Sequence, residues 1–83
     1  MQNKLNIDKE LNIKGEVCPY TFVRSKLALE DLASGQILRV IVDHEPAIKN
    51  VPRSMENEGH AILDVNKINS TDWQIVIQKG KNS

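Results

Sequence analysis

The run QILRVIVD at residues 36–43 constrains the fold of this chain more than any other segment. It is almost continuously aliphatic and rich in β-branched residues, which is typical of a central strand buried on both faces or nearly so. The whole chain has 83 residues, enough for one domain with a small core. The remaining segments must therefore cover this strand within that one domain, whose core we expect to span about residues 10–79.

Two segments before this run alternate apolar and polar residues, KLNID and ELNIKG, and either or both could form the first strand. We favour Glu10 to Lys14, with Gly15 as the turn that ends it.

The segment from Pro19 to Ala33 is predicted to be a helix, because proline suits a first helical position and Ser34-Gly35 suits a helix end. Its buried stripe is expected to hold Phe22, Leu29, Leu32 and Ala33, widened by Val23 and Leu27.

The second half of the chain predicts one more helix and a hairpin. A short turn over Pro46–Asn50 should precede a helix that begins close to Pro52, since proline is unfavourable inside a helix, and Gly59 should end it. HAILDVNKI and WQIVIQK read as two strands joined by the turn NSTD. The fold class is therefore an α+β two-layer sandwich of order β-α-β-α-β-β, with a mixed four-stranded sheet and two helices on one face.

Cys18 is the only cysteine in the sequence and stands directly before Pro19 and the predicted helix. If it caps that helix, its sulfur lies beside backbone N–H groups and the positive end of the helix dipole, which both favour the thiolate. Helix N-termini can lower a thiol pKa from about 8.5 to about 7 or below. A structural role is the simpler alternative, because free cysteines often pack as small hydrophobic side chains.

A single activated thiol limits the possible chemistry. A dithiol oxidoreductase needs a resolving cysteine, which the sequence lacks. A thiol hydrolase needs a base and a cleft of roughly 300 Å³ or more, for which this chain has little room. The separations of His44 and His60 from Cys18 match no usual zinc spacing, so we expect no metal. What remains is to accept a group, such as sulfur held as a persulfide, and to pass it on.

Eleven basic and 11 acidic residues balance, so the chain has no general field to attract nucleic acid or an acidic membrane. No apolar run approaches the roughly 20 residues that cross a bilayer, and the first ten residues carry no signal segment. A free thiol persists best in a reducing compartment. We expect a cytoplasmic protein without direct nucleic-acid or membrane contact.

The stretch GEVCPYTFVRSKLALEDLASGQIL resembles the TusA/SirA-like family of small sulfur carriers. That family's hallmark is Gly-x-x-Cys-Pro-x-Pro, then a helix with a basic residue, a glycine and a hydrophobic strand. The residues that match it are Gly15, Cys18, Pro19, Lys26 and Gly35. Thr21 departs from it by replacing the second proline, which frees the backbone φ of the first turn. The resemblance extends from about Leu11 to Lys79.

The resemblance implies the same fold and a function as a sulfur carrier of the sulfurtransferase type. Cys18 would accept sulfane sulfur from a cysteine desulfurase or a rhodanese-like donor and pass it to an acceptor protein. The downstream route would be tRNA thiolation, sulfur oxidation or cofactor assembly, and we expect no cofactor in the carrier itself. The alternative is a non-catalytic interaction module on the same fold, with a structural Cys18.

Residues after Cys18 are candidates for contact with the partner or the sulfur: Pro19, Tyr20, Thr21, Arg24 and Lys26. Tyr20 would be an exposed aromatic anchor, and the hydroxyl of Thr21 could touch sulfur or a partner. Arg24 and Lys26 could steady the thiolate or dock a partner, although solvated helix charges are the simpler reading. Asp43 is expected to cap the segment that follows its strand.

Overall fold

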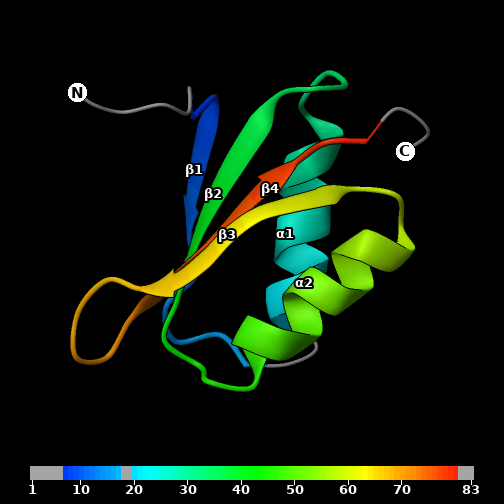
Figure 1. Cartoon of the computed structure of the whole chain (residues 1–83). Helices are drawn as coiled ribbons and strands as arrows, with labels where there is room; N and C mark the ends of the chain where they lie inside the picture. The colour runs from blue at the N-terminus through cyan, green and yellow to red at the C-terminus, as the bar shows by residue number, and fades with distance from the viewer. Residues whose placement is uncertain (1–6, 18–19, 81–83) are drawn as a thin grey trace.

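The computed structural model describes residues 7–17 and 20–80 (Figure 1). Its elements are β1 (Lys9–Asn12), α1 (Tyr20–Glu30), β2 (Ile37–Val42), α2 (Ala47–Asn57), β3 (Ala61–Lys67) and β4 (Trp73–Gln78). The strands form one sheet in the order β1-β2-β4-β3, with β1 parallel to β2 and the other pairs antiparallel. Both helices lie on one face of it (Figure 1). The predicted two-layer sandwich with a mixed sheet is confirmed.

The aliphatic run forms β2, between β1 and β4, where five of its six residues are buried. Leu38, Val40 and Val42 belong to the core between sheet and helices. No helix is needed on the other face, because long polar side chains cover it. Arg39 donates hydrogen bonds to Glu10 (2.7 Å) on β1 and to Gln74 (2.6 Å) on β4, so their aliphatic stems shield the sheet.

The first strand is close to the favoured segment. β1 begins one residue before Glu10 and ends at Asn12, and the amide of Ile13 still donates to the carbonyl of Ile41 at 3.0 Å. The predicted hairpin is also found, with β3 and β4 joined across residues 68–72.

The predicted start of the second helix is wrong. α2 begins at Ala47 and runs through Pro52, which lies inside it. Three fully buried residues at four-residue spacing, Ala47, Val51 and Met55, form the face that packs into the core. Burial along this face offsets the loss of one helical hydrogen bond at proline, which costs about 3 kcal/mol.

The first helix is shorter than predicted, and its predicted buried stripe is confirmed only in part. Leu29 lies in the core, Phe22 and Leu32 are partly buried against it, and Ala33 is exposed. After Glu30 the chain tightens into turns in which Asp31 and Leu32 donate to carbonyls three residues back. The buried face consists of small or polar side chains as well as Leu29: Thr21, Ser25 and Ala28. The expectation that Val23 and Leu27 widen this face is wrong, because both are exposed. Small residues on the buried face let α1 approach α2 and the sheet closely.

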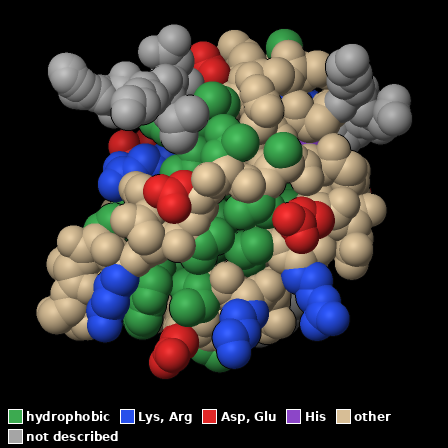
Figure 2. All heavy atoms as spheres, viewed as in Figure 1, with side chains coloured by type: hydrophobic (Ala, Val, Ile, Leu, Met, Phe, Trp, Pro, Cys, Tyr) green, Lys and Arg blue, Asp and Glu red, His purple; other side chains and the backbone are tan. Residues whose placement is uncertain are grey.

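The hydrophobic core fills the space between the two layers, and its margin is only partly covered. Figure 2 shows hydrophobic side chains gathered in a central band of the viewed face, between β3 and α2, with charged side chains on both sides. Partly buried residues that pack against the core include Ile48, Ile62 and Val65.

Candidate functional site

Three connections meet at one end of the sheet. β1 and β2 are parallel and end there, and β4 begins there because it is antiparallel to β2. The loop of residues 13–17, the connection from β2 to α2 and the β3–β4 hairpin therefore lie at this end, at the bottom of Figure 1. Carboxyl ends of parallel strands are a common location for functional sites in α/β sheets. Cys18 and Pro19 follow this loop in sequence and lie outside the described residues.

Three consecutive residues of this loop are each anchored to a different element. Lys14 Nζ pairs with Asp72 Oδ2 of the hairpin at 3.4 Å. The amide of Gly15 donates to Asp43 Oδ1, directly after β2, at 2.9 Å. Glu16 Oε2 accepts from Arg24 Nη1 of α1 at 3.0 Å. The Gly15 hydrogen bond holds the backbone directly, and the two ion pairs between partly exposed side chains add modest support on either side of it.

The tight turn in this loop depends on glycine. The amide of Glu16 donates to the carbonyl of Ile13 at 3.1 Å, and Gly15 between them has φ of +93°. A type II turn requires a positive φ at this position, which glycine adopts without strain. Asp43 was expected to cap the segment that follows β2. In the structure its carboxylate instead accepts a hydrogen bond from the Gly15 amide in the neighbouring loop.

The hairpin that holds Lys14 is itself rigid. Asp72 is buried at its end, where Asn69 Nδ2 donates to Oδ2 at 2.9 Å and Thr71 Oγ1 to Oδ1 at 3.1 Å. The hydrogen bond from Asn69 is the largest cause that lowers the Asp72 pKa, Thr71 and Lys14 lower it further, and burial opposes them. The carboxylate is therefore ionised and available to Lys14 at neutral pH. Asn69-x-Thr71-Asp72 is a recognisable turn pattern, and this was the signal in the sequence that could have pointed to Asp72.

The start of α1 closes the loop from the other side. The carbonyl of Val17 accepts hydrogen bonds from the amides of Tyr20 at 2.8 Å and Thr21 at 3.3 Å. Two of the first-turn donors that a thiolate at residue 18 could have used thus already have an acceptor.

The predicted binding residues are separated by the structure. Tyr20 is exposed, as expected of an anchor, whereas Thr21 is fully buried, and its carbonyl accepts from Ser25 Oγ at 2.8 Å. Thr21 therefore faces the interior of the protein. Arg24 lies beside the loop, where its guanidinium forms an ion pair with Glu16. The structure brings Tyr20, Arg24 and the loop together.

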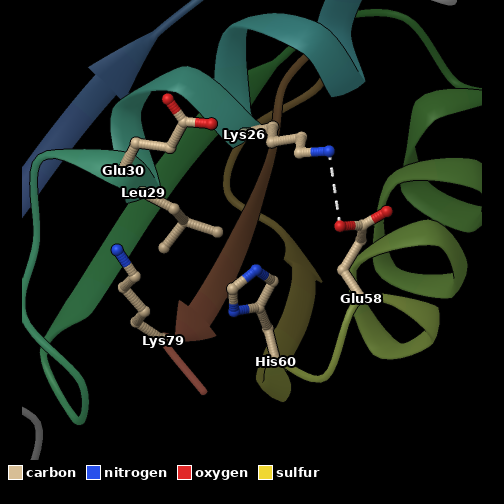
Figure 3. Close-up of a pocket in the computed structure, with 6 residues that line it drawn as sticks. All are labelled: Lys26, Leu29, Glu30, Glu58, His60 and Lys79. Atoms are coloured by element: carbon tan, nitrogen blue, oxygen red, sulfur yellow. Dashed lines mark ion pairs between the residues drawn. The ribbon is translucent and has the colours of Figure 1, made fainter. Parts of the chain in front are cut away.

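Lys26 belongs to another part of the molecule. It lies six residues beyond Tyr20, about 9 Å along the helix axis, and its Nζ pairs with Glu58 Oε1 at 3.3 Å. Both residues point toward each other in Figure 3, at a pocket of about 100 Å³. The pocket is lined by Lys26, Leu29, Glu30, Glu58, His60 and Lys79.

The pocket lies toward the opposite end of the sheet from the loop. His60 precedes β3, which runs in the same direction as β2, whereas His44 follows β2. The two histidines are therefore at opposite ends. Nδ1 of His60 accepts from the Gly80 amide at 3.0 Å, and burial is the main cause that lowers the His60 pKa, so the ring is neutral at pH 7.

Other kinds of site find no support in the described residues. Among them, no group of three or more His, Cys, Asp or Glu side chains could hold a metal ion. Within residues 7–17 and 20–80, no helix is long and apolar enough to span a membrane.

This fold, with an anchored loop that leads to a single cysteine two residues before α1, defines a class of small single-thiol proteins. The chain belongs to the TusA sulfurtransferase family, whose model, described as sulfurtransferase TusA, matches residues 9–79.

Similar proteins are described as candidate sulfur carriers. One from Archaeoglobus fulgidus is 53% identical over 76 residues, which cover 92% of this chain and 86% of the relative. Another, TsuB of Escherichia coli K12, is 35% identical over 71 residues, which cover 86% of this chain and 95% of the relative. The crystal structure of a SirA-like protein from Desulfitobacterium hafniense has a TM-score of 0.77 at 24% identity and covers 88% of this chain and 99% of its own. It shares the fold.

Proposed function

We propose that this protein carries sulfane sulfur as a persulfide on Cys18 and relays it between two proteins. The donor would be a cysteine desulfurase or a rhodanese-like protein in its persulfide form. The Cys18 thiolate attacks the outer sulfur of the donor persulfide, a new S–S bond forms, and the donor thiolate leaves with the electron pair of the broken bond. No external oxidant or reductant is needed. Transfer to the acceptor repeats the exchange, with Cys18 as the leaving thiolate.

One observation carries the proposal: the loop that leads to Cys18 is anchored residue by residue, at Lys14, Gly15 and Glu16. If the thiol only filled the core, the surface loop that leads to it would not need to be anchored. A thiol that must react with the sulfur of another protein gains from being held in a fixed position. A reducing compartment such as the cytoplasm keeps that thiol available. Delivery to tRNA thiolation, sulfur oxidation or cofactor assembly would depend on the acceptor.

The decisive test is sulfur loading followed by intact mass. The protein is incubated with a cysteine desulfurase and cysteine, or with a persulfidated rhodanese-like protein, and weighed without reductant. We expect a gain of about 32 Da, one sulfur, which dithiothreitol removes and which Cys18→Ser lacks. No gain with any donor, while a TusA-family control protein is loaded, would refute the relay.

The pH dependence of Cys18 alkylation separates the relay from the non-catalytic alternative. A carrier thiol should react with iodoacetamide with a midpoint below the value of about 8.5 for a free thiol. A thiol that is protected in the folded protein, or that titrates above 8.5, would favour an interaction module with a structural cysteine.

A further inference from the structure

Four exposed apolar side chains lie on α1 or just before it in the sequence. Val17 is 49% exposed, Tyr20 59%, Val23 43% and Leu27 55%. On α1, residues three and seven positions apart lie on one face, so Tyr20, Val23 and Leu27 are aligned over two turns. We call these four residues the α1 stripe.

The stripe lies on the side of α1 that faces away from the core. At 100° per residue, the buried residues Thr21, Ser25 and Ala28 lie on the opposite side of the helix. The helix thus carries apolar surface on two sides and has only one core to fill. Contiguous apolar surface on a small protein usually marks an interaction site.

The two basic residues beside the stripe are already paired within the protein. Arg24 pairs with Glu16, and Lys26 pairs with Glu58. A partner that bound these two basic residues through its own carboxylates would have to displace Glu16 and Glu58. The stripe therefore fits a partner with a complementary apolar surface better than an acidic one.

The size of the stripe indicates a brief contact. Four half-exposed side chains offer no more apolar surface than the largest patch of an ordinary monomer, roughly 300–600 Å². A stable interface buries about 800 Å² on each partner. A stable dimer of this chain would need more surface than the stripe provides, whereas an encounter for sulfur transfer would not.

We propose that the α1 stripe is the docking surface for the protein that donates sulfur to Cys18. This inference rests on the proposed relay. The donor must bring its persulfide to this thiol, and the two nearest described residues on either side of it in sequence, Val17 and Tyr20, both belong to the stripe.

The test is a double substitution in the stripe with a matched control. Val23→Gln with Leu27→Gln removes apolar surface in the part of the stripe remote from the thiol, and glutamine is a good helix former. Leu63→Gln on β3 is the control, since Leu63 is an apolar residue that is 39% exposed elsewhere. Loading by a desulfurase with cysteine should slow about tenfold or more in the double variant and stay unchanged in the control.

Loading by a small persulfide, such as glutathione persulfide, separates docking from chemistry. The double variant should accept sulfur from it at the wild-type rate, because a small donor needs no docking surface. Equal loading of wild type and double variant by the protein donor would overturn the stripe while the relay stands. If the wild type accepts no sulfur from any donor, the relay fails and the stripe proposal with it.

Competition gives a second measurement that needs no loading of the competitor. An excess of Cys18→Ser should occupy the donor and slow the loading of wild type. The same competitor with both stripe substitutions should not. Inhibition of equal strength by both competitors would contradict the proposal. Because the contact is apolar, raising the salt concentration should change the loading rate little.

Discussion

Asp43 provides a direct test of how the loop before Cys18 is held. Its Oδ1 accepts the Gly15 amide at 2.9 Å across 28 residues of sequence. Asp43→Ala removes this acceptor, whereas Asp43→Asn keeps an oxygen acceptor but removes the charge. A hydrogen bond to a charged group contributes about 1.5–3 kcal/mol. Since this pair is exposed, we expect the lower part of that range or less, about 1 kcal/mol.

A loss of about 1 kcal/mol corresponds to a change of about fivefold in the local opening equilibrium. Amide hydrogen exchange by NMR reads this at Gly15 itself. Exchange at Gly15 should accelerate about fivefold in Asp43→Ala and less in Asp43→Asn, while core amides such as that of Val40 stay protected. Sulfur loading of Cys18 should fall in the same order. Asp64→Ala is the control, because Asp64 is an exposed carboxylate on β3.

Unchanged exchange at Gly15 in Asp43→Ala would refute the reasoning, since the hydrogen bond would then contribute nothing to the loop. If exchange accelerates but loading is unchanged, the anchor holds the loop without serving sulfur transfer. The anchoring of the loop would then no longer support the proposed function.

Three further substitutions test the rest of the structure. Burial lowers the pKa of His60, so its neutral form stabilises the fold above pH 6.5, and this stability is lost as the pH falls through the folded pKa. Urea unfolding between about pH 7.5 and 5 should show this decrease in the free energy of unfolding. His60→Gln should lack the part of the pH dependence that comes from His60. Pro52→Ala should restore a helical N–H and raise the free energy of unfolding by about 1 kcal/mol or more; a lower midpoint would contradict this. Thr21→Pro should change it by less than about 1 kcal/mol in the same assay, because the Thr21 bond to Val17 is longer, at 3.3 Å, than that of Tyr20, at 2.8 Å. A larger loss would show that the first turn needs this N–H or that proline does not fit the buried position of Thr21.

The parts of the fold that local pattern controls could be predicted. The aliphatic run became the central strand, and the order of elements followed from periodicities of 2 and 3.6 and from turn residues such as Gly15 and Gly59. Pro52 misled the prediction of α2, because a local rule against proline was weaker than the burial of Val51 and Met55 on the adjoining turns.

The candidate site was predicted only in part. The position of Cys18 before a helix could be read from adjacent residues, but its loop anchors could not. Lys14 and Asp72 are 58 residues apart, and Gly15 and Asp43 are 28 apart. No periodicity connects such pairs, because the sheet topology alone brings them to the same end.

The sequence by itself determined which segments are strands and helices, because backbone preference and side-chain period act over a few residues. It also determined the single thiol and the absence of a resolving cysteine. Only the tertiary structure decided that Ser25 and Ala28, rather than Val23 and Leu27, join Leu29 on the buried side of α1. That side is set by how closely Ser25 and Ala28 let the helix approach its neighbours. The same packing left Val23 and Leu27 on the surface, on the helix that begins two residues after Cys18.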